Sequence, residues 1–103
     1  MSLYWLSRAA GQDLLEIIDY IAGSNLDAAF RMRDRLEVAF ARLAARPGLG
    51  HIRNDLVAPG MEVRFWPVGR YLVIYRSAQD GIVIVRVLSG YRDVAAILAR
   101  VGS

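Results

Sequence analysis

The sequence has 103 residues with thirteen arginines, no lysine and ten acidic residues, giving a formal net charge of +3 and a pI near 9.8. We expect residues 1–103 to fold as one domain, and the absence of cysteine and the single histidine, His51, predict no disulfide, no metal and no cofactor. No stretch approaches the ~20 apolar residues that span a bilayer, and the N-terminus lacks a secretory pattern, so we expect a cytoplasmic protein without a membrane partner.

The chain begins with a short predicted strand and a helix. Residues 3–6 are aromatic and aliphatic, and Ser7 can cap the helix that follows. Over residues 8–22 the apolar residues recur at helical spacing, and Gly23 is suited to end the helix.

A second helix is predicted over residues 25–45, where Ser24-x-x-Asp27 resembles a capping box. Its apolar stripe consists of Ala29, Met32, Leu36, Phe40 and Leu43. A separate basic face consists of Arg31, Arg35, Arg42 and Arg46. Because the connection at Gly23-Ser24 is so short, we expect the two helices to form an antiparallel hairpin, which Pro47-Gly48 ends.

Beyond residue 47 the apolar period falls toward two, which predicts strands over residues 62–66, 70–76 and 82–89. The turns between them are short, so the strands should form an antiparallel meander. From about Arg92 onward, a helical spacing predicts a terminal helix or a docked coil. The predicted fold class is α+β: a two-helix antiparallel hairpin packed on a small, mainly antiparallel sheet, with a short C-terminal helix or tail.

Both faces of the two longer strands are apolar. One face of the strand over residues 70–76 carries Tyr71, Val73 and Tyr75, and the other carries Leu72 and Ile74. The helical hairpin covers one face, and only the short tail remains for the other. We therefore expect one apolar face to be partly open and to be closed by a second chain. The alternative is that the tail and the loops cover it.

Arginines lie in or beside every predicted strand of the second half, at Arg64, Arg70, Arg76 and Arg86. With Tyr71, Tyr75 and Tyr91 they could converge on one patch suited to phosphate contact and stacking, although strand-end arginines are commonly just solvated. Arg86 interrupts an apolar run and requires a partner, for which Glu62 is a candidate.

Catalytic motifs are absent from the sequence. No serine lies in a G-x-S-x-G elbow, and His51 in its loop is predicted to be a surface residue. The carboxylates of Asp13, Glu16 and Asp19 are predicted to be surface neighbours on the first helix rather than an acid/base pair.

The order of elements and four local motifs resemble the RelE/ParE toxin superfamily of bacterial toxin–antitoxin modules, and its ParE branch in particular. The resemblance covers about residues 3–98. The motifs are Asp13-Leu14-x-x-Ile17-x-x-Tyr20-Ile21, Leu43-x-x-x-Pro47-x-x-Gly50-x-x-Arg53, Gly60-x-x-x-Arg64 leading into Pro67-x-Gly69-x-Tyr71-x-x-x-Tyr75, and Ile84-x-Arg86-Val87-Leu88-x-Gly90-x-Arg92-Asp93.

The resemblance implies a ParE-like toxin of a type II toxin–antitoxin module, of plasmid or chromosomal origin. Such a toxin inhibits DNA gyrase and is neutralised, in a hetero-oligomer, by a ParD-like antitoxin whose flexible C-terminal segment folds across it. Acidic residues on that segment would meet the arginine face of the second helix. The partner-binding residues that we expect are Arg31, Arg35, Arg42, Arg64, Tyr71, Val73, Tyr75, Arg86 and Arg92.

The alternative within the superfamily is a RelE-like, ribosome-dependent mRNA endoribonuclease. Its catalytic residues here would be Arg64, Arg86, Tyr91 and Arg92. The chain has no lysine, arginine transfers protons poorly because its pKa stays above ~12, and Ser89 stands where many relatives have histidine. We therefore favour a toxin without catalytic residues, and direct nucleic-acid contact stays open, as does a member that binds antitoxin yet poisons nothing.

Overall fold

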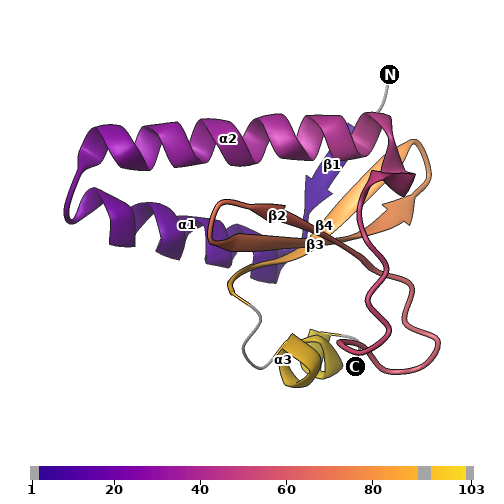
Figure 1. Cartoon of the computed structure of the whole chain (residues 1–103). Helices are drawn as coiled ribbons and strands as arrows, with labels where there is room; N and C mark the ends of the chain where they lie inside the picture. The colour runs from indigo at the N-terminus through magenta and orange to yellow at the C-terminus, as the bar shows by residue number, and fades with distance from the viewer. Residues whose placement is uncertain (1–2, 91–93, 102–103) are drawn as a thin grey trace.

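The computed structural model describes residues 3–90 and 94–101, with side chains through residue 99. The elements in chain order are β1 (Leu3–Leu6), α1 (Arg8–Ala22), α2 (Leu26–Ala45), the 3₁₀ turn η1 (Pro47–Leu49), β2 (Arg64–Val68), β3 (Tyr71–Ala78), β4 (Gly81–Ser89) and α3 (Val94–Val101). Figure 1 shows the α1–α2 hairpin on one side of the sheet and α3 on the other, so the predicted α+β class is confirmed.

Both long helices begin at a side-chain cap. The Ser7 hydroxyl accepts a hydrogen bond from the Ala10 N–H at 3.0 Å, as its position predicted. At the second helix, Asn25 is extended, and its carboxamide oxygen accepts from the Ala28 N–H at 2.9 Å. The cap is therefore Asn25 and not the predicted Ser24, and α2 begins one residue later than expected.

The sheet has the strand order β1-β4-β3-β2. The three later strands form the predicted antiparallel meander, and β1 pairs in parallel with β4. The turn between β2 and β3 is tighter than predicted, because Gly69 with φ +58° allows a two-residue connection and Pro67 extends β2. Pro67 is tolerated there because β2 is an edge strand.

A first core layer lies between the helical hairpin and the sheet. Its largest fully buried side chains are Leu36, Phe40, Leu43, Val73, Tyr75, Ile82, Ile84 and Val87. This layer buries Tyr71, Val73 and Tyr75 on one face of β3, which are 5%, 0% and 0% exposed.

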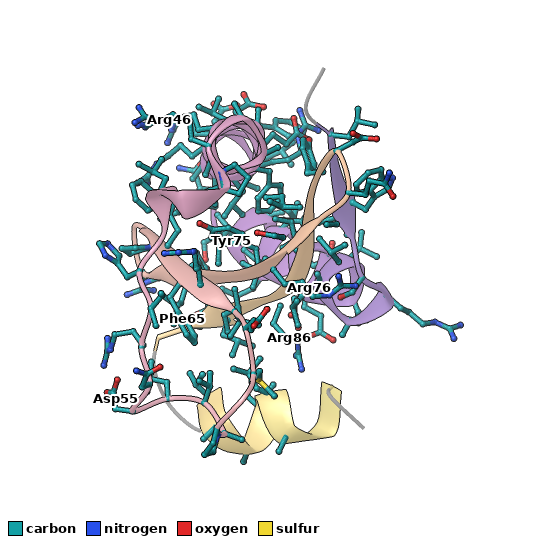
Figure 2. The ribbon with its side chains drawn as sticks, turned by 90° about the vertical axis from the view of Figure 1, so that its right-hand side faces the viewer. Arg46, Asp55, Phe65, Tyr75, Arg76 and Arg86 are labelled. Carbon is teal, nitrogen blue, oxygen red and sulfur yellow. The ribbon has the colours of Figure 1, made fainter. Side chains whose placement is uncertain are left out.

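A second core layer covers the opposite face, so the expectation that this face is left open to a second chain is wrong. Its buried residues are Val63, Phe65, Leu72, Ile74, Val85, Leu88, Val94 and Leu98. The cover comes from α3 and from the connection before β2, whose Leu56, Val57 and Met61 pack against this layer. Figure 2 shows Tyr75 on the α2 side of the sheet and Phe65 on the α3 side.

Candidate functional site

An ion pair joins the first helix to the last strand. The Arg86 guanidinium donates to both carboxylate oxygens of Asp13, each at 2.6 Å. Asp13 is 7% exposed and Arg86 keeps 22% of its side chain exposed. Hydrogen bonding to Asp13 raises the pKa of Arg86, with burial opposing it. Glu62 is therefore not the partner of Arg86, and Asp13 is not a surface residue, because α1 packs this side chain against the sheet.

The Asp13 carboxylate also accepts a backbone hydrogen bond from the edge of β4, beyond the point where β1 ends. The pairing of β1 with β4 extends only to Ile84. Beyond that point the Ser7 hydroxyl donates to the Val85 carbonyl at 2.8 Å, and Asp13 accepts from the Val87 N–H at 3.0 Å. Side chains from the start of α1 thus take the place of a continued strand.

Tyr75 stabilises the turn that follows α2 through two hydrogen bonds. Its buried hydroxyl donates to the Pro47 carbonyl and accepts from the Gly50 N–H, both at 2.7 Å, while Arg64 donates to the Gly50 carbonyl at 3.0 Å. Burial raises the pKa of the Tyr75 hydroxyl, and the Gly50 hydrogen bond and the Arg64 charge oppose this rise. Tyr75, like Tyr71 and Val73, is a buried residue of the core.

The strand arginines do not converge on one patch. Arg64 lies opposite Tyr75 and Arg86 lies opposite Ile74, which places the two arginines on opposite faces of the sheet. Arg64 and Arg76 line a hollow of about 780 Å³, whereas Arg70 and Arg86 line a different one of about 430 Å³. Tyr91 and Arg92 lie outside the described residues.

The basic face of α2 borders a groove against the β2–β3 turn. Arg31, Arg35 and Arg42 are exposed, as the helical pattern predicted. The groove, which we call the α2 groove, has a volume of about 480 Å³. It is lined by Asp34, Arg35, Val38, Ala39, Arg42, Trp66, Pro67, Val68 and Gly69.

Two aromatic contacts of the α2 groove were not apparent from sequence. The Arg42 guanidinium lies over the Trp66 ring at 6.0 Å from its centroid. The His51 ring stacks on Trp66 at 5.9 Å and 12°. No local pattern links these residues, because they come from α2, the following loop and β2.

An exposed apolar strand is a second surface that the sequence analysis missed. All four residues of β1 are exposed, from 36% at Tyr4 to 45% at Trp5, and Tyr4 packs its ring against Phe40 at 5.4 Å. β1 is an edge strand without a charged residue, which is the kind of edge that pairs with other chains.

The described parts of the chain contain neither a cluster of metal ligands nor a helix that could span a membrane. Residues 3–90 and 94–101 contain no group of three histidine, aspartate or glutamate side chains positioned to hold a metal ion. Within those same ranges no helix has the length and apolar character to cross a bilayer.

A family model and a curated relative identify one family. The model of the ParE toxin of the type II toxin–antitoxin system, parDE, matches residues 4–94. Toxin ParE3 of Caulobacter vibrioides is 35% identical over 95 residues, covering 91% of this chain and 92% of that relative. A solved structure described as the chromosomal ParDE TA system from P. aeruginosa matches with a TM-score of 0.69 at 22% identity, covering 87% of this chain and 97% of that one. At that identity the structural match speaks for the fold alone.

Proposed function

This chain belongs to the ParE toxin family of type II toxin–antitoxin systems, and from that premise we propose that it inhibits DNA gyrase in the cytoplasm and is neutralised by a cognate ParD-like antitoxin. We treat residues 1–103 as one toxin domain. The proposed toxin acts by binding its target, without catalytic residues of its own.

The observation that carries this proposal is the closed Asp13–Arg86 pair. A ribonuclease would use Arg86 to stabilise the charge that develops on a phosphate. Here its Nε and one of its two terminal nitrogens donate to the two carboxylate oxygens of Asp13, each at 2.6 Å. Arg64 is likewise engaged, with Gly50, on the other face of the sheet. This arrangement supports a binding toxin over the endoribonuclease alternative.

The exposed arginines of α2 are the residues that we propose for antitoxin binding. Arg31, Arg35 and Arg42 stand clear of the core and carry positive charge. Tyr71, Val73 and Tyr75 are omitted from this proposed surface because they are buried. We place Arg92 on the surface that meets the target.

The test uses purified gyrase, relaxed plasmid and ATP, with the purified chain added in increasing amounts. We expect loss of supercoiling and an accumulation of cleaved DNA, and we expect the complex of the chain with its co-expressed antitoxin to be inactive. In parallel, the chain is added to translating ribosomes with a reporter mRNA. Codon-phased cuts in that mRNA, with unaffected gyrase, would overturn the proposal in favour of the ribonuclease. Activity in neither assay also overturns it.

A further inference from the structure

We propose that the α2 groove binds an acidic amphipathic helix, in which two carboxylates seven residues apart flank an apolar side chain. The inference rests on the proposed function, since the helix would belong to the antitoxin. It names the shape and the charge spacing of the segment that neutralises this toxin.

Two guanidinium groups reach across the groove from α2. A methyl group added at Gly69 would lie 3.3 Å from a terminal nitrogen of Arg35, so Arg35 extends over the β2–β3 turn. Seven residues further along the helix, the Arg42 guanidinium lies over the Trp66 ring. Both charges are therefore presented in the groove and not at the far side of α2.

Neither arginine is neutralised by the described part of the chain. The ion pairs found there join Arg33 to Asp34, Arg53 to Asp55 and Arg86 to Asp13. Asp34 lies on the groove wall, and its contact is with Arg33 at 3.6 Å. Arg35 and Arg42 are thus available for carboxylates of a partner.

Apolar surface lies between the two charges. Val38 is 60% exposed and shares the helix face of Arg35 and Arg42, because the three residues stand at i, i+3 and i+7. Val68 is buried on the opposite wall, beside the half-buried Trp66. An apolar side chain placed between two carboxylates would cover Val38 and contact this wall.

The spacing favours a helical partner. Seven residues of α2 correspond to about 10 Å along its axis, and seven residues of a partner helix span the same distance. In an extended peptide, the side chains on one face lie about 6.7 Å apart for residues i and i+2, and about 13 Å apart for residues i and i+4. Neither distance matches the separation of about 10 Å along α2.

The neighbouring strand edge also disfavours an extended partner. His51 exchanges backbone hydrogen bonds with Phe65, both at 2.8 Å, on the outer edge of β2. The next outward position is Pro67, which has no N–H to donate. A peptide strand would therefore find no continuous ladder on this edge, whereas a helix satisfies its own backbone.

The test uses a labelled, alanine-rich helical peptide of about eighteen residues with two glutamates seven apart and two leucines between them. A second peptide has the same composition but glutamates five apart, which places them on different helix faces. Fluorescence anisotropy with the purified chain should show at least about tenfold tighter binding of the first peptide. Equal affinity for the two peptides would overturn the inference.

Charge reversal supplies the matched variants. Arg35→Glu and Arg42→Glu should each weaken the first peptide by about tenfold, and the double variant should bind a version with lysines in place of the glutamates. Arg8→Glu makes the same change in net charge at the exposed start of α1, outside the groove, and should have a smaller effect. A loss with Arg8→Glu as large as with Arg35→Glu would overturn the groove as the site.

The gyrase assay on the wild-type chain distinguishes a failure of the groove inference from a failure of the proposed gyrase inhibition. Gyrase inhibition without discrimination between the peptides would overturn the groove and leave the gyrase proposal standing. Peptide discrimination without gyrase inhibition would support the groove and overturn the gyrase proposal. In either case the outcome assigns the failure to one of them.

Discussion

The Asp13 carboxylate on α1 accepts both hydrogen bonds of the Arg86 guanidinium on β4, and a third from the Val87 backbone N–H. The three bonds fasten the helical hairpin to the longest strand of the sheet. The residues concerned are more than seventy positions apart in the chain. This contact therefore forms only when the whole domain folds, and its removal should lower the free energy of unfolding of the domain.

Replacing Asp13 with Asn should lower the free energy of unfolding by about 2 kcal/mol, because Arg86 then loses its charge partner while remaining largely buried. This loss of stability is smaller than the ~3–5 kcal/mol typical of breaking a fully buried ion pair, because 22% of the Arg86 side chain is exposed to solvent. Urea unfolding followed by circular dichroism measures it. Adding Arg86→Met should cost little more than the single change. Asp19→Asn, on the exposed face of α1, is the control, and an equal loss of stability there contradicts the prediction.

Replacing Tyr75 with Phe should lower the free energy of unfolding by about 1–3 kcal/mol at neutral pH, because Gly50 and Pro47 lose a buried partner. The pKa of Tyr75 is raised in the folded chain. A raised pKa means that the stabilisation is fully present below about pH 10, the unfolded value, and is lost as pH rises through the folded value. The difference between wild type and variant should therefore narrow in alkaline solution.

Urea midpoints measured from about pH 8 to about pH 11 check this narrowing. Tyr20→Phe is the matched control, since Tyr20 is 75% exposed. A gap between wild type and Tyr75→Phe that stays constant over this range would show that the hydroxyl does not contribute as described.

Replacing Gly81 with Ala should release β1 from the sheet. A methyl group at this position would overlap the Leu3 carbonyl, which is backbone and has no freedom to swing away. Gly11→Ala is the matched change inside α1, where an added methyl meets nothing within 4 Å, and it should stabilise by about 0.5–1 kcal/mol. Hydrogen exchange at the Ser7 N–H, which donates to Ile84, reports β1 docking. Unchanged protection in Gly81→Ala would refute the prediction.

Replacing Arg92 with Ala should weaken gyrase inhibition by about tenfold while changing antitoxin affinity by less than about threefold, because we place this residue on the target surface. Supercoiling assays and titration of the antitoxin measure the two effects. Arg33→Ala is the control for loss of one surface charge. Equal inhibition by both variants would remove Arg92 from the target surface.

Local patterns along the chain were sufficient to predict the helices, the meander and the basic face of α2. These features depend on the spacing of apolar residues, on caps such as Ser7 and on short turns, all of which act over a few residues. The motifs at Asp13, Pro47, Gly69 and Arg86 also sufficed to indicate the ParE family, which the family comparison confirmed.

The contacts that these elements make through their side chains are apparent only in the folded chain. Arg86 forms its ion pair with Asp13 and not with Glu62. The second face of the sheet is covered by α3 and by Leu56, Val57 and Met61. The buried hydroxyl of Tyr75 accepts a hydrogen bond from the Gly50 N–H and so stabilises the turn after α2. Each outcome depends on which segments meet after the chain has folded. The sequence of the strands cannot specify this, because a continuous apolar run such as residues 71–75 makes both faces of the strand apolar.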